Sequence, residues 1–397
     1  MYLVHFRSRD LTRLHRQGQF WHIFFTHGGV IIAQDELDTW TTHLPVPVEF
    51  EQSTMPPEEQ IYRVLGGQGD PYEIEVDDIL VSSVWRPNNA IADSYCSPHR
   101  RVYLAGDAAH QNIPTGGYGM NTGLGDAYDI AWKLALVICG VSGDAMLQSY
   151  EAERRPVAIR NVKRAAEHMA VHQHYVARAL AAGSDMMLGS SEESKALKTQ
   201  IANFVNEHDG ENKDHGIEMG YRLIGSPVIC DEGDTAEPHW SPRVYTPSTR
   251  PGNRAPHVLL ESSGASVFDQ LGAQYTVVDF SETGLLSQRL VQLGRLKGLP
   301  IERTHLPDDG NARKVWERDV VLIRPDHFVA WRNDTDGSYT DAQLSSILDK
   351  VFGRQLPSTP PLSTRVDGTA QDLSFAGATE VWNQDLVKVD RLAVFQN

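Results

Sequence analysis

A strand, a glycine-rich turn and a helix are predicted to follow one another in residues 101–139, and this run constrains the fold more than any other stretch. It reads RVYLAGDAAHQNIPTGGYGMNTGLGDAYDIAWKLALVIC. The apolar residues 102–105 predict a buried strand that ends at Gly106. From about Met120, apolar residues recur at helical spacing. This order places the first amides of a helix beside a glycine-rich loop, an arrangement that binds negatively charged groups.

Small residues and one carboxylate in this run suit a ligand. Gly106 has no Cβ, so a ligand can approach its backbone closely. Asp107 follows the expected strand and can accept hydrogen bonds from ligand hydroxyls. Pro114 fixes one φ angle, and the glycines after it can adopt positive φ. The helix dipole favours negative charge at the amides that begin the helix, those of Gly119, Met120 and Asn121. The competing interpretation is that the glycines serve only close packing.

The run resembles the second flavin-binding motif of the single-component FAD-dependent aromatic hydroxylases. That motif is Gly-Asp-Ala-Ala-His, a proline, Gly-x-Gly-x-Asn, and a helix that contains Asp-Ala and Trp-Lys-Leu. The matching residues here are 106–110, Pro114, Gly117, Gly119, Asn121, 126–127 and 132–134. Further matching stretches are YEAERRPVA at 150–158, PGNRAPH at 251–257 and IRPDHFVAWR at 323–332. These stretches indicate the phenol hydroxylase-like branch, and the resemblance covers residues 1–353.

The resemblance implies an α/β (α+β) FAD-binding hydroxylase fold followed by a thioredoxin-like domain. Asp107 would hold the ribityl chain of the flavin, and Gly106 would let it approach. The helix start would meet the pyrimidine edge of the flavin through Gly117, Gly119, Met120 and Asn121. The backbone near Pro114 would border the place where the flavin C4a-hydroperoxide forms, with His110 as a polar neighbour. Pro114 and His110 are therefore the residues assigned to catalysis.

The implied reaction is the hydroxylation of an aromatic ring. NAD(P)H reduces FAD, O₂ adds to the flavin, and the distal oxygen passes to a phenolic or aromatic polyketide-type substrate. Such a product would belong to secondary metabolism. The protein must exclude water and help to ionise the phenol. A Baeyer–Villiger oxidation of a ketone on the same scaffold stays open.

The family's dinucleotide-binding motif, Gly-x-Gly-x-x-Gly between a strand and a helix, is not found ahead of this run. The sequence GGQG at 66–69 lacks the spacing and the preceding apolar strand. The acidic residue that grips the adenosine ribose, about 20 residues further on, is not found either. The family's middle Asp-Gly motif and the segment that carries its catalytic tyrosine and aspartate are also missing. We therefore expect an incomplete FAD/NAD(P)-binding fold, from a truncated gene model, an internal start or a split gene.

An incomplete fold has consequences for function. We expect this chain alone to bind FAD weakly or not at all. One alternative is a non-catalytic flavoprotein remnant, or a subunit that needs a separate N-terminal half. Another is a thioredoxin-like interaction module that carries an inactive flavin domain.

The N-terminal region is predicted to be sheet. The expected strands are 1–6, 20–25 and 30–33. In the resembled family this region belongs to the sheet that roofs the substrate site. Alternation would turn either His22 and Phe24, or Trp21, Ile23 and Phe25, toward the substrate. We favour His22 and Phe24, with a plain core role as the alternative.

We expect five segments along the chain. Residues 1–56 are the remainder of the substrate-binding sheet, and 57–183 are the C-terminal part of the FAD-binding domain. Residues 184–241 are a helical connection, 242–354 the thioredoxin-like domain, and 355–397 a flexible tail rich in proline and serine at its start.

Elements are predicted within these segments from periodicity. The helices are 58–65, a long pattern from 159 to Gly183, 193–207, 266–271, 285–296 and 341–352. The strands are 73–84, 258–261, 275–280 and 301–305, with a hairpin at 319–332. Pro156 is expected at the start or a kink of the long helix. His168, His172 and His174 could include a metal pair, but a solvated helix face is the favoured interpretation, and no metal site is assigned.

Charge and cysteine content limit the other classes of function. The net charge of −16 argues against a nucleic-acid surface. The three cysteines are widely spaced and form no Cys-x-x-Cys, which argues against a disulfide framework and against redox catalysis by the last domain. The N-terminus lacks a signal peptide core, and no stretch is long and apolar enough to span a membrane. We expect a cytoplasmic protein whose last domain serves packing or homodimerisation.

Overall fold

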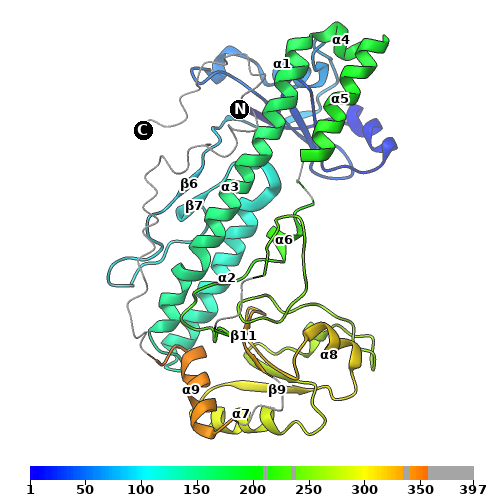
Figure 1. Ribbon diagram of the computed structural model, residues 1–397. Helices are drawn as coiled ribbons and strands as arrows, with labels where there is room; N and C mark the ends of the chain where they lie inside the picture. The colour runs from blue at the N-terminus through cyan, green and yellow to red at the C-terminus, as the bar shows by residue number, and fades with distance from the viewer. Residues whose placement is uncertain (209–210, 212, 234–237, 334–338, 356–397) are drawn as a thin grey trace. The chain divides into compact units, whose positions relative to one another are not determined.

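The computed structural model describes residues 1–208, 211, 213–233, 238–333 and 339–355 (Figure 1). The chain divides into two compact units. Unit 1 comprises Met1–Ala131, Glu151–Arg222 and Thr235–Ser248, and unit 2 comprises Trp132–Tyr150, Leu223–Asp234 and Thr249–Asn397. In the described part of the chain, no helix has both the length and the apolar character needed to cross a membrane.

Unit 1 contains a five-stranded antiparallel sheet with the order β2-β3-β4-β1-β5. Its strands are β1 (Tyr2–Arg7), β2 (His22–Phe24), β3 (Val30–Ala33), β4 (Thr39–Leu44) and β5 (Asp78–Val84). The predictions of β1, β2 and β3 are confirmed, whereas β4 was missed. The strand predicted at 73–84 forms only from Asp78 onward. Since β5 pairs with β1, the sheet extends across the boundary expected at residue 56.

One face of this sheet is closed by α1 (Pro57–Gly66). Val4, Phe6, Ile31 and Trp40 are fully buried on that face, together with the helix residue Ile61. The helix begins with proline in its first turn, where no amide donor is needed, and ends before Gly67 at φ 63°. The prediction of this helix is confirmed. Because successive side chains of a strand point to opposite faces of the sheet, the residues between these buried ones point to the face that α1 does not cover.

Two long helices run side by side in unit 1 (Figure 1). They are α2 (Tyr118–Ile138) and α3 (Ala145–Ala182), and their last and first turns respectively belong to unit 2. Asn161 on α3 donates a hydrogen bond to Thr122 on α2 over 2.8 Å. Pro156 lies inside α3, a helix of 38 residues, so of the start or kink expected at this proline the start is wrong. The shorter elements of unit 1 are β6 (Ala90–Ile91) and β7 (His110–Gln111), which precede the two long helices, and α4 (Ser184–Leu188), α5 (Glu192–His208) and α6 (His215–Glu218), which follow them.

Unit 2 contains a four-stranded mixed sheet with the order β11-β10-β8-β9. Its strands are β8 (Tyr275–Asp279), β9 (Ile301–His305), β10 (Val320–Ile323) and β11 (Val329–Asn333). The helices are α7 (Leu285–Leu296), α8 (Gly310–Trp316) and α9 (Asp341–Val351). Because β8 and β9 are parallel and joined through α7, the predicted βαβ unit is confirmed. The predicted hairpin is confirmed as β10 and β11.

Two elements predicted for the last part of the chain differ in the structure. The strand expected at 258–261 is wrong, because this stretch forms only an isolated bridge between Leu259 and Ser266. The helix expected at 266–271 is a short 3-10 turn, Val267–Gln270. The tail expected from residue 355 lies outside the described residues except for Gln355 itself.

Candidate functional site

The glycine-rich run forms two tight turns that lead into α2. The buried strand expected at 102–105 is wrong, since only an isolated bridge joins Tyr103 to Cys96 and the side chain of Val102 is 59% exposed. Backbone hydrogen bonds still hold this stretch extended, including one from the amide of Leu104 to the carbonyl of Tyr95 over 2.8 Å. The first turn, Gly106–Ala108, therefore follows an extended stretch, as the motif requires.

Gly106 is required at this place by both its conformation and its packing. Its φ is 57°, in the left-handed region that favours glycine. A Cβ added at Gly123 on α2 would lie 3.2 Å from the Cα of Gly106, so the two glycines let the turn and the helix approach closely. Asp107 follows and is exposed. The turn thus presents the carboxylate of Asp107 to solvent, where a ligand can reach it.

Asp126 is the buried anchor of this first turn. One of its carboxylate oxygens accepts hydrogen bonds from the amide of Gly106 over 3.1 Å and from Nε2 of His110 over 2.8 Å. The other accepts from Nε of Arg154 on α3 over 2.8 Å. Burial would raise the pKa of Asp126, but the hydrogen bond from His110 and the charge of Arg154 outweigh it and lower the pKa. Two stretches that carry the family resemblance, one on α2 and one on α3, therefore meet at a single carboxylate.

His110 is enclosed by this network. Its side chain is 1% exposed, and its second ring nitrogen, Nδ1, lies 3.3 Å from Oδ1 of Asn112. Since both ring nitrogens have protein partners, the imidazole does not face solvent. Through Asp126, His110 is bonded to the first turn, and its expected place beside an oxygen-transfer centre stays a prediction.

The second turn carries Pro114 and two glycines. Pro114 has φ −69°, and the glycines after it, Gly116 and Gly117, have φ 80° and 67°. Nothing lies within 4 Å of the position that a Cβ would occupy at Gly117, so this edge of the turn borders open space. A Cβ at Gly116 would instead collide with the ring of Tyr118. Only glycine fits both positions without strain.

Three buried contacts hold the second turn. The hydroxyl of Thr115 donates to the carbonyl of Ala165 on α3 over 2.6 Å. The amide of Gly116 donates to Oε1 of Glu211 over 2.8 Å. The hydroxyl of Tyr118 donates to Oδ2 of Asp214 over 2.9 Å. The segment after α5 therefore clamps the turn, a role that the sequence did not reveal because these contacts join residues about 95 positions apart.

Asp214 is also the partner of an arginine and a histidine of α3. Arg164 contacts it over 2.6 Å, and Nε2 of His168 lies 3.1 Å away. Burial would raise the pKa of Asp214, but these partners lower it strongly. His168 is 1% exposed, so the solvated face expected for it is wrong. His168 therefore belongs to the group of side chains that anchors the turn.

Helix α2 begins directly after this turn. The first amides of an α-helix have no acceptor within the helix, and here they are those of Tyr118, Gly119 and Met120. The side chain of Met120 is 74% exposed, and the side-chain amide of Asn121 folds back to the carbonyl of Gly117 over 2.9 Å. The amides, the helix dipole and the open edge at Gly117 together fit the anionic edge of a flat ring system such as a flavin.

The sheet of unit 1 has a face that α1 does not cover. Strand register places His22, Ile32, Thr41 and His5 in one row across this face. The next row holds Phe24, Val30, His43 and Leu3. The structure thus sets His22 and Phe24 on the face opposite the core. The alternative set, Trp21, Ile23 and Phe25, points the other way. Trp21 is 65% exposed, and Phe25 packs against the core that α1 covers.

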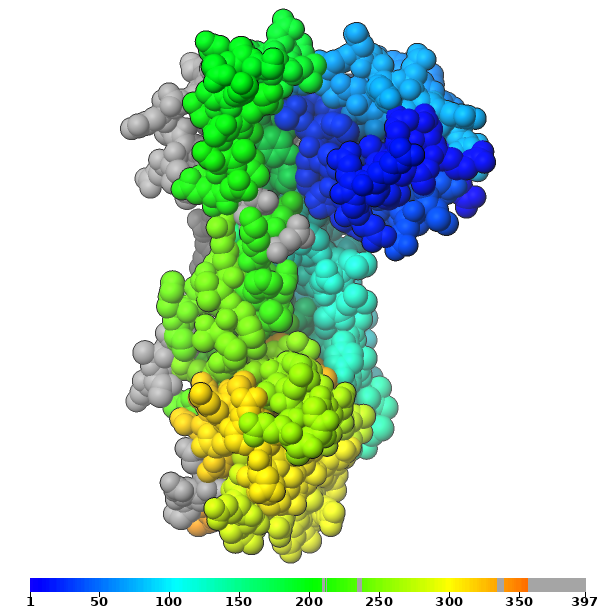
Figure 2. Space-filling view, turned by 90° about the vertical axis from the view of Figure 1, so that its right-hand side faces the viewer, coloured from blue at the N-terminus to red at the C-terminus, as the bar shows by residue number. Residues whose placement is uncertain are grey.

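Polar and aromatic groups alternate on this face. Nδ1 of His5 lies 2.9 Å from the hydroxyl of Thr41, to which Gln34 donates over 2.9 Å. The rings of His22 and Phe24 are 4.6 Å apart, and the ring of His172 on α3 is 4.2 Å from that of Phe24. Phe24 also packs against a cluster formed by residues of α3 and α5, and Figure 2 shows the N-terminal residues (blue) against this helical region (green). Histidine, threonine and aromatic side chains thus lie next to one another on the face that α1 does not cover.

His43 makes stability depend on pH. Burial, helped by the charge of the N-terminal ammonium, lowers the pKa of His43 to about 4. The unfolded side chain has a pKa of about 6.5, so between these values only the unfolded chain binds a proton there, and stability falls as the pH falls. We expect the urea midpoint to drop between pH 7 and pH 4.5, and to drop less in His43→Gln. The exposed control His99→Gln should behave like the unmodified protein, and equal slopes in all three would contradict the assignment.

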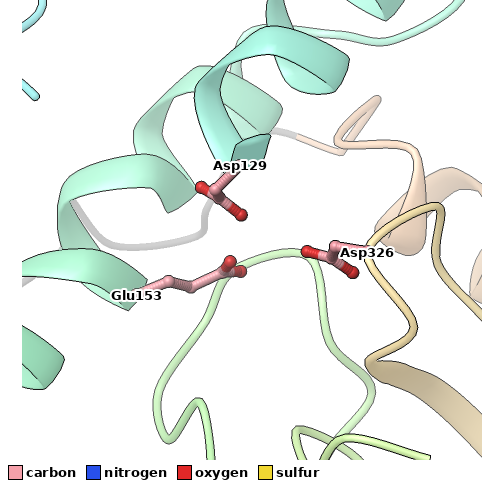
Figure 3. Close-up of side chains that lie close together, drawn as sticks. All are labelled: Asp129, Glu153 and Asp326. Atoms are coloured by element: carbon pink, nitrogen blue, oxygen red, sulfur yellow. The ribbon is translucent and has the colours of Figure 1, made fainter. Parts of the chain in front are cut away.

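Acidic side chains also approach one another elsewhere. Figure 3 shows Asp129 on α2 and Glu153 on α3, both in unit 1, and Asp326, which belongs to unit 2. The two carboxylates of unit 1 are buried, with 4% and 2% exposure. A pair of acidic groups does not define a metal site. No metal is therefore assigned to it.

Two family models match the chain. One is described as an FAD binding domain and matches residues 2–165, and the other as the C-terminal part of aromatic-ring hydroxylases and matches residues 248–355. The chain is 43% identical to an FAD-dependent monooxygenase of Emericella nidulans over 86% of its own length and 56% of that protein. It is 41% identical to an FAD-dependent monooxygenase of Penicillium oxalicum, over 86% of its own length and 67% of that protein.

Solved structures agree with these matches. The rebeccamycin biosynthetic enzyme RebC with reduced flavin superposes with a TM-score of 0.72 at 27% identity. The match covers 89% of this chain and 63% of that one. The chain thus spans between about half and two-thirds of the length of the proteins that it resembles.

Proposed function

This chain belongs to the family of FAD-dependent aromatic-ring hydroxylases, and on that premise we propose that it takes part in the hydroxylation of a phenolic or polyketide-type aromatic substrate. Relatives named as FAD-dependent monooxygenases support the reaction class, and a putative polyketide hydroxylase of Streptomyces halstedii supports the substrate class. The family is enzymatic, and FAD is its cofactor. NAD(P)H as the reductant and O₂ as co-substrate are part of the proposal.

One observation carries the proposal. The two turns before α2 are fixed from inside by buried carboxylates, while Asp107 and the edge at Gly117 face outward. A site whose backbone is held rigidly and whose polar groups point to open space is prepared for a ligand. Asp107 would bind the ribityl hydroxyls, and the amides of Gly119 and Met120 would meet the pyrimidine edge.

The flavin would carry out the oxygen chemistry, and residues of the protein would exclude water, position the turn and orient the substrate. Bound flavin, once reduced, supplies the activation of O₂ and the transfer of one oxygen atom to the ring. Pro114 would border the reacting atoms and help to exclude water from them. His110 would hold the first turn through Asp126. On the sheet face, His22 and Phe24 would orient the aromatic substrate, and the hydroxyl of Thr41 would accept or donate a hydrogen bond to it.

Substrate-stimulated oxidation of NADPH tests this function. Purified chain would be mixed with FAD, NADPH and 2-naphthol, alone and with the segment of the Penicillium relative that it does not match. We expect little oxidation by the chain alone, since no dinucleotide-binding motif is present in the sequence, and stimulation by the added segment. In Phe24→Ala the naphthol-dependent part should fall about 10-fold or more, as expected for the loss of an aromatic contact. No stimulation under any condition would contradict the proposal.

A further inference from the structure

One buried carboxylate joins the glycine-rich turn to helix α3. Oε1 of Glu211 accepts the hydrogen bond from the amide of Gly116 over 2.8 Å, and Oε2 lies 3.1 Å from Nε2 of His172. Glu211 is 8% exposed. Burial would raise the pKa of Glu211, but the contacts with His172 and with the amide of Gly116 lower it. The carboxylate is therefore charged at neutral pH, and both of its oxygens are occupied.

The imidazole of His172 has a second set of contacts on its other side. Nδ1 lies 2.9 Å from the hydroxyl of Tyr175, and the ring is 4.2 Å from the ring of Phe24. Phe24 is in turn 4.6 Å from His22, on the face of the sheet that α1 does not cover. The side chain of His172 thus touches both this His22–Phe24 pair, through Phe24, and the carboxylate that anchors the turn.

We propose that Glu211 and His172 are positioning residues that link the Gly116 peptide to the His22–Phe24 pair. An aromatic ligand on the sheet and a ligand at the turn then act on the same imidazole. The inference rests on the proposed function, because it takes the sheet face as the place of the aromatic substrate. It adds two residues to the site, neither of which touches the reacting atoms.

The physical reason lies in the conformation of the turn. Gly116 has φ 80° and is free of side-chain constraints, so its peptide orientation depends on what its amide binds. A buried, charged acceptor gives a strong hydrogen bond and fixes that orientation. If a ligand displaces the ring of Phe24, His172 must move with it or lose the contact. Its hydrogen bond then carries the displacement to Glu211 and to the amide of Gly116.

Nuclear magnetic resonance of the full chain can observe this amide directly. Labelling threonine at the carbonyl carbon and glycine at nitrogen selects the Thr-Gly peptides, which are those of Gly116, Gly123 and Gly284. Gly123 and Gly284 serve as internal references. In Glu211→Gln we expect the Gly116 resonance to move upfield, because a neutral amide oxygen replaces a charged acceptor, while both references stay in place. The exposed control Glu218→Gln should change none of the three.

The link to the His22–Phe24 pair is tested with 2-naphthol as the probe. We expect naphthol to shift the Gly116 resonance in the unmodified chain. In His172→Phe, which keeps a ring beside Phe24 but cannot bond Glu211, naphthol should still quench tryptophan fluorescence while the Gly116 shift is lost. His174→Phe is the matched control, because His174 packs against Phe204 instead, and it should keep the shift.

The outcomes separate this inference from the proposed function. A Gly116 shift that survives in His172→Phe, or no shift in the unmodified chain with naphthol bound, would overturn the link alone. Failure of naphthol to bind any variant would overturn both the link and the assignment of the sheet face. An unchanged Gly116 resonance in Glu211→Gln would overturn the positioning role of Glu211 whatever the naphthol result.

Discussion

Asp126→Asn is expected to lower the free energy of unfolding of unit 1 by about 3–5 kcal/mol, because removing one charge from a buried ion pair leaves the other unpaired. Asp126 is fully buried, and Arg154 on α3 is 5% exposed. The substitution keeps the shape of the side chain but removes the charge that balances the guanidinium. It also weakens the hydrogen bonds from the Gly106 amide and from His110.

Urea unfolding followed by circular dichroism would measure this loss, with hydrogen exchange in α2 to assign it to unit 1. The matched control is Asp107→Asn, an exposed carboxylate in the turn that Asp126 anchors, and it should stay within about 0.5 kcal/mol of the unmodified protein. If Asp126→Asn and Asp107→Asn had the same small effect, the buried anchor described above would be wrong.

Asp107→Ala should have the opposite profile, with unchanged stability and a large loss of flavin affinity. A charged acceptor that bonds a ligand hydroxyl contributes about 2 kcal/mol, which corresponds to a fall in affinity of about 30-fold. The exposed Asp93, in the same unit, provides the control Asp93→Ala, which should bind flavin like the unmodified chain. Quenching of flavin fluorescence in a titration measures both. Equal affinities for all three proteins would remove Asp107 from the proposed site.

Elements with strong periodicity were predictable from the sequence. The helix predicted at 285–296 has the observed bounds of α7, and the helix predicted from about Met120 begins as α2 at Tyr118. In β4, by contrast, threonine at three of six positions hides the alternation, and the strand was missed. The short helix α8 was also missed, although Asp309 caps it by accepting from the amide of Ala312.

The candidate site was predictable in part, for a similar reason. A contiguous motif contains Gly106, Asp107 and Gly117, so their local geometry could be inferred from residue type. The partners that hold them could not, because Arg154, Glu211 and Asp214 come from distant parts of the chain and meet the turn only through tertiary packing. The burial of His110 could not be inferred either, because a histidine next to a ligand motif and a histidine buried behind it look the same in sequence.

The turn and the start of α2 are proposed to bind the ring and ribityl part of a flavin. A fluorescence titration of the unmodified chain with FMN and with FAD tests this assignment. We expect weak binding of both with nearly equal affinity, because Asp107 and the amides of the turn would contact the half that the two molecules share. Failure of both flavins to bind at millimolar concentration, or binding that requires the adenosine half, would contradict it.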